Sequence, residues 1–206
     1  DLPFNIQISK IDLKKLKRFI PSSKKNIKKN YLKKIVDKIH NSKRPVFICG
    51  GGVKIAKANK EFLNLVHKIN VPFVTTWTSQ DITPYDNRLY FGTIGRHGNQ
   101  CANEIIESAD LVVSLGCRFN PKTINENFGL KKKNKVIAVD IDKEELSEPL
   151  IKITEKINID IKFLLNQKIK IKKITRNDWI KFCKLKKEEK FLNNLLDKKS
   201  KNLVNP

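Results

Sequence analysis

The chain has 206 residues, enough for one ordinary domain with a buried core, and no apolar stretch approaches the roughly 18 residues that a transmembrane helix needs. Hydrophobic residues make up 39% of the sequence and recur in runs, which favours a globular fold over disorder. The formal net charge is +22, but only six of the 43 cationic residues are arginine and no nucleic-acid-binding motif is present. We therefore interpret the lysine excess as a solvated surface and expect no specific nucleic-acid partner.

The cysteine pattern and the absence of methionine bear on origin and location. The four cysteines, Cys49, Cys101, Cys117 and Cys183, form no CxxC pair, which argues against a zinc site or a disulfide framework. No signal peptide is visible, so we expect a cytoplasmic protein without a membrane segment. Because the sequence contains no methionine, we expect a chain that was processed or excised from a longer protein.

The predicted elements alternate between apolar strands and amphipathic helices. Residues 1–30 resemble a linker in composition, although apolar residues at helical spacing begin at Ile27. The segments that follow are a helix to Ile39, a strand at 46–49, three glycines, a helix to Ile69, a strand at 71–75, a glycine-punctuated loop at 89–95, a helix at 102–109, a strand at 111–115, a strand at 136–141, a short helix after Asp142, a strand near 150–153 and a helix at 161–165.

Continuous apolar strands separated by amphipathic helices predict a parallel sheet that is covered on both faces. We therefore predict an α/β domain over residues 31–167, with a Rossmann-like parallel sheet. Residues 168–206 are rich in lysine and have a helical tendency around 179–196, and we interpret them as a second linker.

Three clusters follow strand ends, where ligands bind in open α/β sheets. Gly50, Gly51 and Gly52 follow the first strand; they either let the backbone approach a diphosphate or only form a tight turn. Arg96 and His97, flanked by glycines, either hold a phosphate or lie in an ordinary exposed loop.

The third cluster, Gly116 to Arg118, places an arginine at a strand end, whereas Cys117 is interpreted as a small buried side chain and not as a nucleophile. Asp140 is a candidate acceptor for a ribose hydroxyl, and Asp142 is interpreted as a helix N-cap. Because right-handed crossovers return each strand end to the same edge, we expect the three clusters to converge. No catalytic or metal-ligating residue is predicted.

Residues 44–160 resemble the central domain of thiamine-diphosphate-dependent enzymes related to acetolactate synthase, which implies that the Rossmann-like sheet is of the DHS-like NAD/FAD-binding type. The matching runs are RPVFICGGGV (44–53), VPFVTTW (71–77), FGTIGRHGNQCAN (91–103), SADLVVSLGCRFN (108–120) and KVIAVDIDKEEL (135–146). The Thr-Thr-Trp run and the loop after it are most similar to a subgroup associated with polysaccharide or sugar-nucleotide loci. The family positions that match are Gly51, Gly52, Thr76, Arg96, His97, Gly116 and Arg118.

This resemblance implies a transferase or lyase that acts on 2-keto acids with thiamine diphosphate and Mg²⁺ in the full-length protein. It also implies that the activating Glu and the Gly-Asp-Gly motif lie in an N-terminal and a C-terminal domain, the partners that this chain lacks. The full-length protein would be a homo-oligomer and the isolated chain inactive. Central domains of the family hold FAD, a nucleotide such as ADP, or nothing, and Asn120-Pro121 departs from the FAD-binding pattern.

Two alternatives of other classes remain. One is a free-standing FAD- or NAD-binding module, and the other is a basic nucleic-acid-binding protein, which the scarcity of arginine disfavours.

Overall fold

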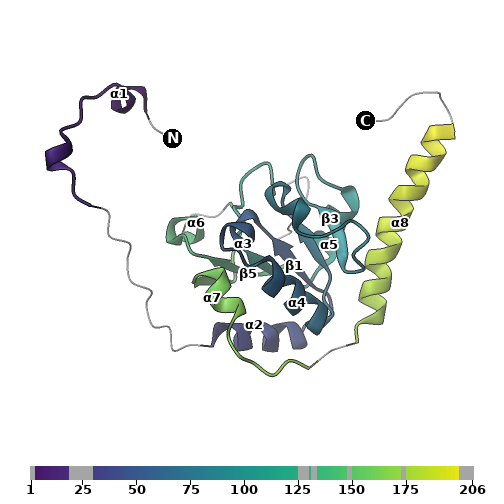
Figure 1. Ribbon diagram of the computed structural model, residues 1–206. Helices are drawn as coiled ribbons and strands as arrows, with labels where there is room; N and C mark the ends of the chain where they lie inside the picture. The colour runs from purple at the N-terminus through teal and green to yellow at the C-terminus, as the bar shows by residue number, and fades with distance from the viewer. Residues whose placement is uncertain are drawn as a thin grey trace.

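A computed structural model of the protein describes residues 3–18, 30–124, 130, 134–147, 150–172 and 175–199. Its centre is a six-stranded parallel sheet with the strand order β3-β2-β1-β4-β5-β6. Figure 1 labels β3, β1 and β5, which lie in this order across the sheet. The strands are β1 (Pro45–Cys49), β2 (Phe73–Thr75), β3 (Tyr90–Thr93), β4 (Leu111–Leu115), β5 (Lys135–Asp140) and β6 (Glu155–Asn158). The chain runs outward from β1 to β3 and then returns to β4 beside β1, so the strand order reverses between β1 and β4. The predicted Rossmann-like α/β fold is confirmed.

Helices cover both faces of the sheet. The helical segments are α1 (Phe4–Gln7), η1 (Leu13–Lys15), α2 (Tyr31–His40), α3 (Gly51–Ile55), α4 (Asn59–Ile69), η2 (Trp77–Ile82), α5 (Gln100–Ser108), α6 (Lys143–Ser147), α7 (Ile161–Leu165) and α8 (Asn177–Lys199). Side chains of α2, α4 and α7 share one hydrophobic cluster, and those of α5, α6 and α8 share another. Successive residues of a strand point to opposite faces, so Phe47 joins the first cluster while Val46 and Ile48 join the second.

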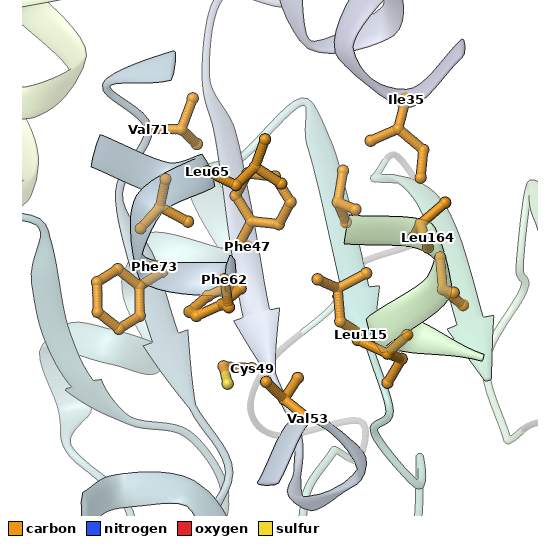
Figure 2. Packing of buried hydrophobic residues seen from close by; sticks show 14 of the residues in the cluster. Ile35, Phe47, Cys49, Val53, Phe62, Leu65, Val71, Phe73, Leu115 and Leu164 are labelled. Atoms are coloured by element: carbon orange, nitrogen blue, oxygen red, sulfur yellow. The ribbon is translucent and has the colours of Figure 1, made fainter. Parts of the chain in front are cut away.

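Aromatic rings pack the centre of the first face. Phe62 of α4 makes edge-to-face contacts with Phe47 of β1, at a centroid distance of 6.0 Å, and with Phe73 of β2, at 5.3 Å (Figure 2). All three rings are fully buried. Such pairs stabilise a core beyond the area they bury, by about 1 kcal/mol each. They fix α4 across the two strands whose ends begin the cleft described below.

Helix α2 illustrates how local sequence sets an element. Leu32, Ile35, Val36 and Ile39 recur at helical spacing and are all buried. The side chain of Asn30 caps the helix by accepting a hydrogen bond from the Lys33 amide at 3.0 Å, so α2 starts at Tyr31. The earlier start at Ile27 that the sequence suggested lies outside the described residues.

The edge strand β6 is joined to α2 by ion pairs. Glu155 contacts Lys34 at 2.6 Å and also accepts a hydrogen bond from Lys38. Burial alone would raise the pKa of the Glu155 carboxyl, but the hydrogen bonds from Lys34 and Lys38 outweigh burial and hold the pKa below its ordinary value of 4.5. The ionised carboxylate therefore stabilises this edge of the fold.

Three predicted elements differ from the structure. The segment 89–95, interpreted as a loop, contains β3, which Gly92 obscures with its left-handed φ of 99°. The strand expected near 150–153 lies at β6, where only Ile157 is buried and the apolar signal is therefore weak. The single helix expected before Ile69 is divided at Lys57, whose φ is 52°.

The two segments that flank residues 31–167 differ in whether they pack against the domain. The side chains of residues 3–12 and 14–18 are exposed and contribute nothing to the core. In contrast, the first half of α8 packs on the domain: Trp179 is buried and its indole Nε1 donates to the Pro45 carbonyl at 2.8 Å. In the part of the chain that the structure describes, no helix combines the length and the apolar composition needed to cross a membrane.

Candidate functional site

The glycines after β1 and β4 bring two turns into direct contact. A Cβ added at Gly50 would lie 2.0 Å from the Gly116 carbonyl oxygen, and one at Gly52 would lie 2.7 Å from the Gly116 Cα. The Gly50 amide donates to the Leu115 carbonyl at 2.9 Å, and the Gly52 amide donates to the Gly116 carbonyl at 3.0 Å. Gly50 and Gly52 therefore allow the turn after β1 to pack against the turn after β4. Their backbone amides already donate hydrogen bonds within the protein.

Hydroxyl groups follow β2 on the neighbouring side. The Thr76 amide donates to the Cys49 carbonyl at 3.0 Å, which holds the segment against the end of β1. The Thr76 hydroxyl lies 3.1 Å from that of Thr78 and 3.2 Å from that of Ser79. Ser79 in turn donates to the Cys49 carbonyl at 2.5 Å. This network fixes the backbone on both sides of the exposed Trp77.

The loop after β3 brings His97 close to Trp77, which follows β2, at the same edge of the sheet. The rings of His97 and Trp77 are tilted against each other with centroids 6.0 Å apart. The Arg96 amide donates to the Lys122 carbonyl at 2.9 Å, so the backbone of this loop is fixed against the segment after β4. The Arg96 side chain is exposed. His97 is also exposed, but of the two residues only His97 lines the cleft described below.

Charged groups follow β4 and β5. Arg118 forms an ion pair with Glu145 of α6, with 2.8 Å between Nε and Oε1, and 73% of the Arg118 side chain remains exposed. Asp142 accepts a hydrogen bond from the Glu144 amide at 2.9 Å, which confirms its predicted role as an N-cap. Asp140 accepts a hydrogen bond from the Asp142 amide at 2.9 Å. The carboxylates thus order the β5–α6 turn.

These segments enclose a cleft of about 930 Å³ at the carboxyl edge of the sheet, over the point where the strand order reverses. The predicted site residues that line it are Gly51, Gly52, Thr76, His97, Gly116, Arg118 and Asp140. Gly50 and Arg96 are not among the lining residues. The structure therefore brings residues from all three predicted clusters together at one edge. That they bind a ligand stays a prediction.

Several lining residues were not singled out from the sequence. Trp77, Ile55 and Ile141 add exposed apolar surface to the cleft, and Glu145 and Asp160 add carboxylates. Asp160 follows β6, which the sequence predicted near 150–153. Because the end of this strand was misplaced, Asp160 was not recognised as a residue at a strand end. Exposed apolar side chains carry a signal only when the fold shows that they surround one cavity.

The thiols near the cleft have structural surroundings. Cys117 is 7% exposed, and burial raises the pKa of its thiol to about 12, although a hydrogen bond with Ser114 opposes the rise. Burial likewise raises the pKa of the fully buried Cys49 thiol far above its ordinary value. Neither thiol is ionised at neutral pH, so neither is a nucleophile. Over the described ranges, no group of three or more His, Cys, Asp and Glu side chains is arranged to hold a metal ion.

The kinds of side chain that line the cleft are those that commonly contact a nucleotide. Trp77 and His97 line the cleft with aromatic rings, Asp140 carries carboxylate oxygens that accept from hydroxyls, and Arg118 and Lys122 carry positive charge. The Arg118–Glu145 ion pair uses Nε of the guanidinium, so a bound phosphate would compete with a carboxylate for this side chain.

Comparison with known proteins places the chain in a family. Residues 32–167 match the family described as "Thiamine pyrophosphate enzyme, central domain". The probable acetolactate synthase large subunit of Methanococcus aeolicus is 30% identical over 184 residues, which cover 85% of this chain and 29% of that protein. The acetolactate synthase large subunit of Lactococcus lactis is 31% identical over 160 residues, covering 77% of this chain and 28% of that protein.

Other relatives carry other names. The probable sulfoacetaldehyde acetyltransferase of Rhizobium meliloti is 31% identical over 126 residues, covering 60% of this chain and 20% of that protein. The chain therefore spans less than a third of the length of each of these relatives. The match over 32–167 agrees with the parallel sheet, whose described strands and most of whose covering helices lie within those bounds. On these grounds, the chain belongs to the family of thiamine pyrophosphate enzyme central domains.

Proposed function

We propose that the chain is the central domain of an acetolactate-synthase-like enzyme that decarboxylates a 2-keto acid and transfers the resulting carbanion to an acceptor. The observation that carries this proposal is the match of 32–167 to the central domain of thiamine pyrophosphate enzymes, together with relatives named as acetolactate synthases. Thiamine diphosphate, with Mg²⁺, supplies the carbanion stabilisation when it is bound. We infer that its sites lie outside the 206 residues, because the sequence contains no Gly-Asp-Gly run.

Within such an enzyme, the domain contributes a scaffold and a cleft of nucleotide-binding type, and no catalytic group. The protonated thiols of Cys49 and Cys117 support this view. In the cleft, Asp140 is proposed to accept from a ribose hydroxyl, and Arg118 to bind a phosphate of FAD or ADP. His97 and Trp77 supply the ring faces.

The first experiment tests whether the chain alone can bind thiamine diphosphate and release CO₂ from pyruvate. The purified chain is incubated with pyruvate, thiamine diphosphate and Mg²⁺, and CO₂ release is measured against a blank without protein. We expect no release above the blank, and heat of binding for thiamine diphosphate is expected to be absent from calorimetry. Turnover by the 206-residue chain would overturn the assignment of the chemistry to other domains.

The second arm tests the cleft. ADP and FAD are titrated into wild type, into Arg118→Gln and into Arg88→Gln, which removes the same charge outside the cleft. Binding that only Arg118→Gln weakens supports the nucleotide site. If wild type binds neither compound, the cleft is a structural feature of the family fold and this part of the proposal is wrong.

A further inference from the structure

A second cavity, of about 590 Å³, lies between the α2–β1 connection and the start of α8. It is at the amino end of β1, whereas the nucleotide-type cleft is at the carboxyl end, and the two cavities share no lining residue. His40, Lys43, Arg44 and Arg176 all line it. Four basic side chains around one cavity form a feature that the proposed function does not use.

The charge of Arg176 is buried, and its hydrogen-bond donors are only partly paired. The residue is 8% exposed. Its Nε donates to the Ser42 carbonyl at 3.2 Å and its Nη2 donates to the Ile39 carbonyl, so one edge of the guanidinium closes the end of α2. Nη1 is buried and, among the residues that the structure describes, has no hydrogen-bond partner. A buried donor of a charged group that has no partner is unfavourable because its lost hydration is not replaced, which indicates a missing acceptor.

The surroundings favour an anion as that acceptor. The side chains of Lys43 and Arg44 are exposed at the cavity, and Asn177 begins the 23-residue helix α8, whose first-turn amides add partial positive charge. The carboxylates nearby are Asp178, in the same first turn, and Asp110.

Asp110 does not satisfy Nη1, because other donors hold its carboxylate. It accepts from the Ser42 hydroxyl, from the Lys43 amide at 2.8 Å and from the Arg44 amide at 2.9 Å. Asp178 is then the single carboxylate among the residues that line the cavity, against Lys43, Arg44 and Arg176. The cavity is therefore net positive even if His40 is neutral.

We propose that this cavity binds the phosphate group of a small phosphate monoester, with Arg176, Lys43 and Arg44 as its donors. Trp179 and Phe182 line the same cavity with their rings stacked at a centroid distance of 5.4 Å, and they offer an apolar wall to the organic part of the ligand. The site is independent of the nucleotide-type cleft and of the proposed reaction.

Phosphate binding is tested by nitrogen-15 NMR on the full 206-residue chain, with inorganic phosphate as the first probe and phenyl phosphate as the second. Ionic strength is held constant with sodium chloride. The Trp179 indole N–H and the Arg176 Nε–H report on this cavity, and the indole N–H of Trp77 reports on the other cleft. We expect saturable shifts of the first two signals, with phenyl phosphate binding about threefold or more tightly than inorganic phosphate because of the aromatic wall.

Matched variants separate this site from general surface charge. Lys43→Gln and Arg44→Gln, both exposed, are expected to weaken binding by about five- to tenfold each. Lys60→Gln, which removes one charge from an exposed position on α4, is expected to leave affinity unchanged. Absence of saturable shifts in wild type, or equal weakening by Lys60→Gln, would overturn the site. Equal affinity for the two probes would overturn the monoester and leave a free phosphate ion as the ligand.

Discussion

Replacing Gly50 by alanine tests why three glycines follow β1. The new Cβ would lie 2.0 Å from the Gly116 carbonyl oxygen, which is a backbone atom, so the two turns must separate by more than an ångström. Separation would break the hydrogen bonds from Gly50 to Leu115 and from Gly52 to Gly116, each with a net contribution of about 1 kcal/mol. Overpacking adds about 1–3 kcal/mol, so we expect Gly50→Ala to lower the free energy of unfolding by about 3–5 kcal/mol.

Gly51→Ala is the matched control. Its Cβ would meet only the side chain of Thr78, at 2.6 Å from Oγ1, and this side chain is exposed and able to rotate. Rotation loses the contact with Thr76, a cost of about 1 kcal/mol that the better helix propensity of alanine in α3 offsets. Urea denaturation followed by circular dichroism measures both variants. If Gly50→Ala stays within about 1 kcal/mol of wild type, or Gly51→Ala is the more damaging, the close approach of the turns is not the reason for the glycines.

Two further predictions concern the edges of the fold. Glu155→Gln is expected to reduce stability at pH 7 by up to about 1 kcal/mol. Because the folded-state pKa of Glu155 lies below 4.5, that contribution is present above the unfolded value and is lost as the pH falls through the folded value; urea midpoints of both proteins at neutral and acid pH should therefore converge, and a constant difference would contradict this. Trp179→Ala removes a buried ring and its bond to the Pro45 carbonyl, and should cost about 3–5 kcal/mol in the same assay. Lys181→Ala, an exposed change on the same helix, should be nearly neutral, and equal stability of the two variants would show that α8 is not part of the folded unit.

The sequence predicted the elements whose buried side chains form a continuous run or a regular stripe. Residues 111–115 are apolar except for Ser114 and form β4, in which every side chain is buried. The predicted apolar stripe that ends with Ile35, Val36 and Ile39 lies in α2, because its spacing matches one helix face. The edge strand β6 was misplaced because it buries few side chains: its sequence is EKIN, of which only Ile157 is buried. The other edge strand, β3, buries three of its four side chains and was interpreted as a loop because of its glycine, Gly92.

The sequence predicted where the candidate cleft lies in the fold, but it predicted only some of the residues that line the cleft. Strand-end logic located Gly52, His97 and Arg118 because parallel strands present their carboxyl ends to one edge, whereas Thr76 was located only through the family resemblance. It gave no means of separating Gly50, whose Cβ position is filled by another turn, from Gly51, which faces the cleft. Distances between turns remote in sequence decide that difference, and no local pattern encodes them.

The contacts of α8 have a consequence for the order of folding. Arg176 bonds to Ile39 across 137 positions, and Trp179 bonds to Pro45 across 134 positions. During synthesis, α2 and β1 leave the ribosome more than 130 residues before the start of α8 does. Until α8 is made, it cannot cover the amino end of β1. Loop closure over such separations is slow compared with helix formation. The docking of α8 is therefore expected to be the step that completes the domain, and apolar residues beside Pro45 are open to other chains until it occurs.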